Sequence, residues 1–192
     1  MKTCLVKEEF LLSPQIAIWP AKQTVCLLGF MGAGKTTVAI ALAKLLGAAW
    51  VDLDEFIEAR EGRPIAKIIE NLGEPVFREL EADALQEILE TFPSGQQSFV
   101  IALGGGAWTN PFNQNLVQQH NCRTVWLDVP FELCWQRICE SNVDRPLARD
   151  KEQALNLFNA RQKIYQNAEL RVKLTKEQNA QEIAAQIHHL FG

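Results

Sequence analysis

From Thr24 onward, the chain repeats one pattern: a short apolar run, a turn, and then a segment with amphipathic spacing. The apolar runs are nearly continuous and rich in Val, Ile, Leu and Trp, which is typical of parallel strands buried on both faces. These runs lie at 24–30, 49–54, 98–106, 123–130 and 169–175. The segments between them predict helices at 35–46, 54–61, 65–72, 75–92, 113–120, 131–140, 151–167 and 179–191. The alternation predicts an α/β fold.

Domain organisation follows from the same pattern. No long linker, low-complexity tract or internal repeat divides the 192 residues, which fit one domain. Residues 1–20 lack the features of a secretory signal and are expected to form a short N-terminal extension. We expect a single domain over residues 21–192.

Composition and charge exclude several classes of protein. With 47% hydrophobic and 22% charged residues, the chain has an ordinary globular composition and not that of a disordered protein. A net charge of −4 disfavours a large nucleic-acid or anionic-membrane surface, although a local basic cleft is compatible with it. No apolar run approaches the about 18 residues that a membrane span needs.

Cysteine usage indicates a reducing compartment. The five cysteines are odd in number and include no CxxC spacing, so neither a disulfide framework nor a zinc site is predicted. We interpret Cys26, Cys134 and Cys139 as buried free thiols. A cytoplasmic protein is expected, and a monomer, because no long apolar stripe is left unassigned.

Residues 29–36 read GFMGAGKT and match the Walker A pattern G-x-x-x-x-G-K-[ST] between a predicted strand and a predicted helix. Glycines in this loop let backbone N–H groups surround phosphate oxygens, and the helix N-terminus adds a favourable dipole. Lys35 is expected to reach the β- and γ-phosphates and Thr36 to bind Mg²⁺. The ATP-binding residues predicted here are Gly32, Ala33, Gly34, Lys35, Thr36 and Thr37. The motif does not identify the phosphate acceptor.

Asp128 ends another apolar run, TVWLD, in the manner of a second phosphate-site carboxylate. Val129 and Pro130 follow it, and then a helical pattern begins. We therefore interpret Asp128 as a helix cap and not as a metal ligand.

Two carboxylates end the second apolar run, where the alternation of a strand would place Asp52 and Asp54 on the same side. In an α/β sheet this end of a strand faces the ligand crevice. One carboxylate there suits the positioning or deprotonation of an acceptor hydroxyl, and the other suits the waters of Mg²⁺. Two solvated loop carboxylates are the alternative interpretation.

Further along the chain, charged and glycine-rich motifs supply candidate binding groups. Arg78 and Glu81 share a helical face, for which a surface ion pair is the alternative. Gly104, Gly105 and Gly106 close the third apolar run, and Trp108 beside them is a candidate for the pocket wall. Arginines at 145, in a charged loop, and at 161, on the next helix, suit the capture of carboxylate or phosphate.

Together these motifs resemble those of the shikimate kinases, small P-loop kinases of the nucleoside monophosphate kinase fold. The resemblance runs from about residue 24 to 191 and includes GFMGAGKT, DLD, FRELE, LGGGA and RPL in that order, followed by Arg161. It implies a three-layer α/β/α fold with a five-stranded parallel sheet. It also implies a helical substrate-binding segment at 53–83 and a mobile lid at 141–152.

The resemblance also implies the reaction, which is transfer of the γ-phosphate of ATP to the 3-hydroxyl of shikimate with Mg²⁺. By resemblance, Asp54 holds the reacting hydroxyl and is a candidate base, while Asp52 organises Mg²⁺ through water. Lys35, Asp54 and Arg145 form the catalytic core, with Arg145 moving over the phosphates on lid closure. Arg137 is the candidate that stacks on adenine.

The substrate residues implied by the resemblance surround the carboxylate of shikimate. Arg78 and Arg161 match the pair that clamps this carboxylate, and Glu81 matches the residue that orients the first arginine. Gly104, Gly105 and Gly106 match the glycines beside the substrate. The chain departs from the family in the lid, which reads RPLA in place of RPLL.

Two alternatives stay open. One is another small-molecule kinase of the same fold, such as a gluconate or nucleoside monophosphate kinase; the triple glycine, DLD and the two clamp arginines disfavour it. The other is a non-catalytic module that senses ATP, which would not need Asp52, Asp54 and the lid arginine. ATP and shikimate are the expected partners, with no nucleic acid and no membrane.

Overall fold

The computed structural model describes residues 23–91, 98–141 and 150–191. The predicted extension at 1–20 lies outside the described residues. So does most of the predicted lid, including Arg145, because residues 142–149 are not described.

Five strands form one parallel sheet in the order β2-β3-β1-β4-β5. The strands are β1 (Thr24–Leu28), β2 (Ala49–Asp52), β3 (Phe99–Ala102), β4 (Arg123–Asp128) and β5 (Leu170–Lys173). In the central strand β1, Cys26 lies between Ile101 of β3 and Thr124 of β4. The five-stranded parallel sheet expected from the apolar runs is therefore confirmed, and the carboxyl ends of all five strands share one edge.

The helices follow the predicted pattern, with ends that differ from it by at most two residues. They are α1 (Lys35–Leu46), α2 (Leu53–Glu61), α3 (Ile65–Leu72), α4 (Glu74–Thr91), α5 (Pro111–Gln119), α6 (Phe131–Glu140), α7 (Lys151–Tyr165) and α8 (Ala180–Phe191). A single 3₁₀ turn, η1 (Ala107–Thr109), follows β3 and was not predicted.

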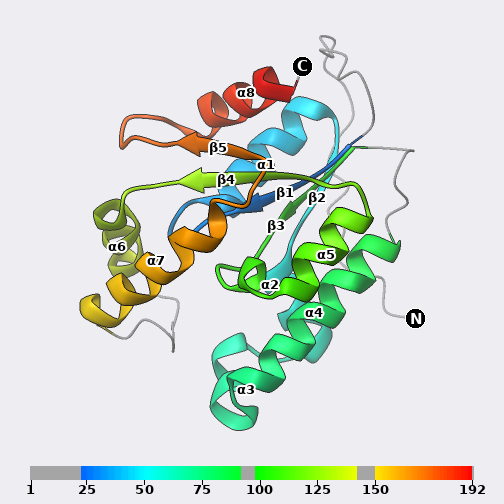
Figure 1. Cartoon of the computed structure of the whole chain (residues 1–192), viewed down its shortest axis with the longest axis vertical. Helices are drawn as coiled ribbons and strands as arrows, with labels where there is room; N and C mark the ends of the chain where they lie inside the picture. The colour runs from blue at the N-terminus through cyan, green and yellow to red at the C-terminus, as the bar shows by residue number, and fades with distance from the viewer. Residues whose placement is uncertain (1–22, 92–97, 142–149, 192) are drawn as a thin grey trace.

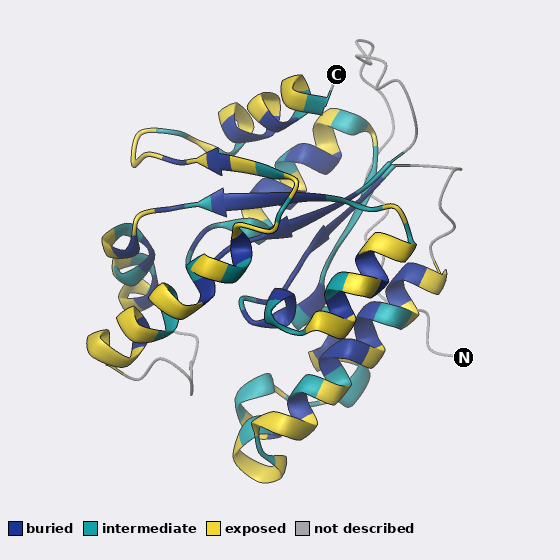
Figure 2. Cartoon of the chain, in the orientation of Figure 1, coloured by how far each residue is buried: buried dark blue, intermediate teal, exposed yellow. Residues whose placement is uncertain are grey.

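Helices cover both faces of the sheet, with α1 and α8 together on one side and α4 and α5 on the other (Figure 1). The strands β1, β3 and β4 are the most buried elements, and the outer helix faces are exposed (Figure 2). Helix α3 and the adjoining parts of α2 and α4 project beyond the sheet (Figure 1). The three-layer α/β/α prediction is confirmed, and none of the described helices is both long and apolar enough to cross a membrane.

The second strand is shorter than the sequence predicts, because it ends at Asp52 and α2 begins at Leu53. Asp52 is the N-cap of α2, and its Oδ1 accepts hydrogen bonds from the backbone N–H of Asp54 at 2.9 Å and of Glu55 at 3.4 Å. A side-chain cap of this kind satisfies N–H groups that have no partner inside the helix. The expectation that Asp52 and Asp54 both project from a strand was wrong, since Asp54 lies in the first helical turn.

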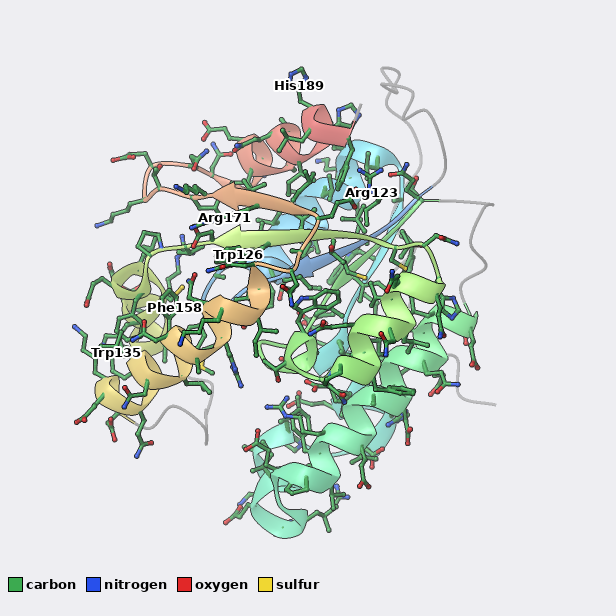
Figure 3. All side chains as sticks on the ribbon, in the orientation of Figure 1. Arg123, Trp126, Trp135, Phe158, Arg171 and His189 are labelled. Atoms are coloured by element: carbon green, nitrogen blue, oxygen red, sulfur yellow. The ribbon has the colours of Figure 1, made fainter. Side chains whose placement is uncertain are left out.

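Asp128 does not cap α6, whose N-cap is Pro130 with no side-chain hydrogen bond. Instead, Asp128 Oδ2 accepts from Arg171 of β5, from Nε at 2.9 Å and from Nη2 at 2.7 Å. Arg171 also lies 4.5 Å from the ring centroid of Trp126, and Figure 3 shows the two side chains beside each other. The interpretation of Asp128 as a helix cap was wrong: the carboxylate joins neighbouring strands.

The cysteines within the described segments are free thiols. Cys26 and Cys134 are buried, as expected, and burial raises the pKa of Cys134 to about 11. Cys139 is exposed, so the prediction of a buried thiol was wrong there. Its neighbour on α6, Trp135, stacks on Phe131 at 6.3 Å between ring centroids, beside Phe158 of α7 (Figure 3).

Candidate active site

A cavity of about 770 Å³ opens at the carboxyl edge of the sheet. Its walls come from the loop between β1 and α1, from α2, α3 and α4, from the turn after β3, and from α6 and α7. Such a crevice is the usual ligand site of an open α/β sheet. The candidate residues lining this cavity are Gly32, Gly34, Lys35, Thr36, Asp52, Asp54, Arg78, Gly105, Gly106, Arg137 and Arg161.

The glycine-rich loop between β1 and α1 is packed closely against α6. Gly32 has a φ of +77°, and a Cβ atom there would lie 2.6 Å from the carbonyl oxygen of Cys134. Only glycine fits this position, since a side chain would meet backbone. Gly34 ends the loop as the N-cap of α1. The loop thus brings backbone N–H groups and a helix N-terminus to the cavity, an arrangement that favours phosphate.

Lys35 and Thr36 begin α1 at the base of the cavity. Lys35 Nζ donates to the carbonyl oxygens of Gly29 at 3.0 Å and Phe30 at 3.1 Å, which fold the side chain back over the loop. Thr36 Oγ1 donates to Asp52 Oδ2 at 2.5 Å. A hydroxyl and a carboxylate in contact are oxygen donors of the kind that Mg²⁺ prefers. These two side chains therefore fit a magnesium ion beside the phosphate loop.

Asp54 and Glu81 approach the same point of the turn after β3. A Cβ atom on Gly104 would lie 2.5 Å from Asp54 Oδ1 and 3.0 Å from Glu81 Oε1. Glycine at this position lets both carboxylates come close to the backbone of the turn. Asp54 lines the cavity beside this turn, where a hydroxyl of a bound molecule can meet its carboxylate.

Arg78 of α4 is held by two carboxylates. Its Nη1 donates to Glu81 Oε1 at 3.0 Å and Oε2 at 2.9 Å, and its Nη2 and Nε donate to Glu74 Oε1 at 2.8 and 3.2 Å. Burial alone would lower the pKa of Arg78, but the Glu81 carboxylate and the hydrogen bonds outweigh it and raise the pKa. Glu81 is 1% exposed, and burial raises its pKa although Arg78 opposes the rise.

Arg161 of α7 is a buried cation, 5% exposed. Within the described segments it forms no ion pair. Its guanidinium lies 5.9 Å from the ring centroid of Phe30, and a Cβ atom on Gly105 would lie 3.4 Å from its Nη1. Burial is the main cause that lowers the pKa of Arg161. A buried cation that forms no ion pair is costly, so this position favours an anionic ligand.

An apolar wall completes the cavity between the charged groups. Ile65 and Ile69 of α3, Phe77 of α4 and Leu103 after β3 line it. Pockets of this kind bind a small molecule through its apolar face and fix its orientation with a few polar groups. The cavity can therefore hold a phosphate donor at the loop and a small molecule with a carboxylate and hydroxyls beside the arginines.

Not every predicted site residue lies on this wall. Arg137 does, and its Nη1 donates to the carbonyl oxygen of Gly32 at 3.1 Å. Ala33 and Gly104 are buried, Thr37 is exposed on α1, and none of the three lines the cavity. Trp108 is 5% exposed and packs into the core, so the expectation that it lines the pocket was wrong.

The sequence analysis missed the apolar wall and also two polar residues beside the arginines. Glu74 precedes Arg78 by four residues on α4 and shares its guanidinium with Glu81. Tyr165 follows Arg161 by four residues on α7, and its hydroxyl donates to the carbonyl oxygen of Gly105. Both spacings place side chains on one helical face, a signal that the sequence contains.

Comparison with known proteins points to one family. The profile of the shikimate kinase family matches residues 31–191. A curated shikimate kinase from Sulfurihydrogenibium sp. (strain YO3AOP1) is 37% identical over 169 residues, which cover 86% of this chain and 98% of that protein. Another, from Lactococcus lactis subsp. cremoris (strain MG1363), is 40% identical over 167 residues, with coverage of 85% and 95%.

A solved structure agrees with the sequence comparisons. Shikimate kinase from Acinetobacter baumannii in complex with shikimate superimposes with a TM-score of 0.79 at 34% sequence identity. The match covers 88% of this chain and 92% of that chain. The likeness therefore extends over both the sheet and the helices that form the cavity.

Proposed function

The chain belongs to the shikimate kinase family, and we propose that its cavity binds ATP and shikimate together and transfers the γ-phosphate to the 3-hydroxyl of shikimate. In this step the hydroxyl oxygen forms a bond to the γ-phosphorus, and the bond from that phosphorus to the bridging oxygen of ADP breaks. The hydroxyl proton passes to a carboxylate and then to solvent. The products are shikimate 3-phosphate and ADP.

The observation that carries this proposal is the pair of arginines that line one cavity. Arg161 is buried without an ion pair among the described residues, and Arg78 faces the same space. Guanidinium groups bind carboxylates by two parallel hydrogen bonds. The carboxylate of shikimate is the matching group, and the apolar wall at Ile65 and Ile69 suits its ring. Residues 53–83 are proposed as the substrate-binding segment.

Asp54 is proposed to hold the acceptor hydroxyl and to take its proton. Its place in the lining of the cavity that the phosphate loop and both arginines also line supports this role. A positioned general base contributes about 10²- to 10⁴-fold to rate. Gly104, Gly105 and Gly106 would border the substrate, because their turn touches Asp54, Arg161 and Arg78 respectively.

The residues that would bind the phosphates of ATP are proposed to act mainly by positioning them and by offsetting their charge. Backbone N–H groups of the loop, at Gly32, Ala33 and Gly34 and at the start of α1 with Thr36 and Thr37, would surround the phosphates. Lys35 would exchange the carbonyl oxygens of Gly29 and Phe30 for phosphate oxygens. Arg137 is proposed to contact adenine, and Arg145, outside the described residues, to cover the phosphates.

Thr36 and Asp52 are proposed to hold Mg²⁺, Thr36 through its hydroxyl and Asp52 through water. Their contact at 2.5 Å supports the assignment, since it joins two oxygen donors at the phosphate loop. When bound, Mg²⁺ neutralises charge on the phosphates during transfer. Asp52 has a second task in the fold, because it also caps α2.

We further propose that the protein acts as a monomer in the cytoplasm. The free thiols of Cys26 and Cys134 suit a reducing compartment, where ATP is also supplied. Gel filtration of the purified chain with and without ATP tests the monomer. Elution at twice the mass of the chain would contradict it.

The substitution Asp54→Asn tests the chemistry. Turnover should fall by about 10²-fold or more while ATP binding is nearly unchanged, because the amide cannot take a proton. Asp83→Asn is the matched control, since Asp83 is an exposed carboxylate on α4. Unchanged turnover in Asp54→Asn would remove this residue from the mechanism.

A coupled assay of ADP release tests the acceptor. Release that depends on shikimate supports the proposal. Release with another acceptor, such as gluconate or a nucleoside monophosphate, would assign the site to a different small-molecule kinase. No dependence on any acceptor would favour an ATP-sensing module.

A further inference from the structure

Tyr165 lies under the cavity and has no role in the reaction proposed above. It ends α7 one helical turn after Arg161 and is 1% exposed. Its ring packs against Trp126 of β4, 6.1 Å between centroids; Trp126 is labelled in Figure 3. A phenol buried this deeply needs a hydrogen-bond partner. That partner is the carbonyl oxygen of Gly105, to which the Tyr165 hydroxyl donates.

Gly105 is the point at which three parts of the site meet. A Cβ atom on Gly105 would lie 3.3 Å from the backbone nitrogen of Met31 in the phosphate loop and 3.4 Å from Nη1 of Arg161. The turn after β3 therefore runs between the phosphate loop and the buried arginine. A shift of Gly105 would therefore displace the backbone against which the Arg161 guanidinium packs.

Arg161 needs such a support because carboxylates do not orient it. Arg78 is fixed by Glu74 and Glu81, but no described carboxylate pairs with Arg161. The Phe30 ring, the backbone of Gly105 and the hydroxyl of Tyr165 lie close to the guanidinium, which interacts with that hydroxyl. Arg78, Glu81 and Glu74 act on it through charge and form no ion pair with it. Burial raises the pKa of Tyr165, so its hydroxyl stays protonated and remains a donor.

We propose that Tyr165 is a positioning residue for substrate capture, whose hydroxyl fixes Gly105 and Arg161 relative to each other so that they present one rigid site to the carboxylate of the substrate. The inference rests on the proposed binding of that carboxylate by Arg161. Preorganised donors bind more tightly, since less freedom is lost on binding.

The substitution Tyr165→Phe tests this role because it keeps the ring against Trp126 and removes only the hydroxyl. The KM for shikimate should rise about tenfold, the value expected for one net hydrogen bond. The kcat and the KM for ATP should stay within about twofold of the parent, since the group acts on one substrate. A merely structural residue would lower the melting temperature without this split.

Thr124→Val is the matched control. It removes another buried hydroxyl, whose oxygen accepts from the backbone N–H of Glu169 at 2.9 Å, on β4 and off the cavity wall. It should lower the melting temperature as Tyr165→Phe does and leave the KM for shikimate unchanged. If both variants raise this KM equally, or if Tyr165→Phe changes only the melting temperature, the proposal is overturned.

A second measurement needs no variant. Tyr165 is the one tyrosine in the chain, so labelling with 3-fluorotyrosine gives a single ¹⁹F resonance. Saturating shikimate should shift this resonance, and ATP alone should shift it less. A resonance that does not move when shikimate binds would overturn the proposal even if Tyr165→Phe failed to fold.

The outcome for Arg161→Ala separates this inference from the proposed function. If Arg161→Ala raises the KM for shikimate and Tyr165→Phe does not, the positioning role fails and the clamp stands. If neither variant changes the KM, the carboxylate clamp itself fails, and the role of Tyr165 fails with it.

Discussion

Arg78 and Arg161 line the same cavity from different helices, and their surroundings differ. Arg78, on α4, uses Nη1 for Glu81 and Nη2 and Nε for Glu74. Arg161, on α7, is more deeply buried and has no carboxylate partner in the part of the chain that the structure describes. Before a ligand binds, the charge of Arg78 is therefore offset by two carboxylates, whereas the charge of Arg161 is not offset by an ion pair.

The two arginines therefore contribute differently to binding: one is better oriented, and the other attracts an anion more strongly. The carboxylates on Arg78 fix its plane and offset its burial, but they also neutralise much of the charge that a substrate would meet. Arg161 keeps its charge, and burial lowers its pKa as the cost. We infer that Arg161 supplies most of the affinity for an anion and that Arg78 supplies most of the geometry.

The largest effect is expected for Arg161→Ala. The KM for shikimate should rise about 100-fold, because charge-assisted hydrogen bonds in a buried site are strong. The melting temperature should change little, since no ion pair is lost. Arg171→Ala, at an arginine on β5 that does not line the cavity, is the control. A rise of less than threefold in Arg161→Ala would refute the assignment of attraction to this residue.

Arg78→Ala should have a smaller effect on binding and a larger one on stability. The KM for shikimate should rise about tenfold, since much of the charge of Arg78 is already neutralised. The melting temperature should fall more than in Arg161→Ala, because buried Glu81 is left without its partner. Thermal unfolding and steady-state kinetics of both variants check the two rankings. If one of the two variants has both the larger rise in KM and the larger fall in melting temperature, the proposed difference between the arginines is wrong.

Glu74→Gln should make Arg78 more like Arg161. Glu74 competes with the substrate carboxylate for Nε and Nη2, and its side chain is 45% exposed. Because exposed ion pairs are weak, the KM for shikimate should fall by only about two- to fivefold. Glu79→Gln, an exposed carboxylate on the same helix, controls for net charge. An increase in KM would mean that Glu74 orients Arg78 and does not compete for it.

The smallest effect concerns the pH dependence of stability at Glu81. Its pKa is raised in the folded protein, so its contribution to stability is present below the unfolded pKa and is lost as pH rises through the folded value. The melting temperature of Glu81→Gln relative to the parent should therefore increase as pH is raised from about 4 to about 7. A difference that is constant with pH would show that Arg78 fully compensates the burial of the carboxylate.

The fold could be predicted because buried parallel strands and amphipathic helices leave strong periodic signals. The ends of strands and helices were harder to predict where a side-chain hydrogen bond fixes them. Asp52 ends its strand by capping α2, and an alternation pattern does not contain that hydrogen bond. The turn η1 is a single 3₁₀ turn with no period of its own.

The site residues also fall into those that local sequence spacing predicts and those that it does not. The phosphate loop is contiguous, so GFMGAGKT could be recognised from spacing alone, and the loop lies where the motif predicts. Partners far apart in sequence could not be found from spacing, as Asp128 with Arg171 and Tyr165 with Gly105 illustrate. Trp108 was misjudged because position beside a glycine turn does not say on which side a ring packs.

The place of β1 in the sheet has a consequence for the order in which the molecule is assembled. It is the first of the described strands to be synthesised, yet both of its neighbours come much later, as the pairing of Thr24 with Phe99 and of Val25 with Arg123 shows. Contacts this distant along the chain close slowly, and strand edges that wait for partners are open to aggregation. The phosphate loop follows β1 directly. The earliest part of the active site to be synthesised is therefore among the last to acquire its final surroundings.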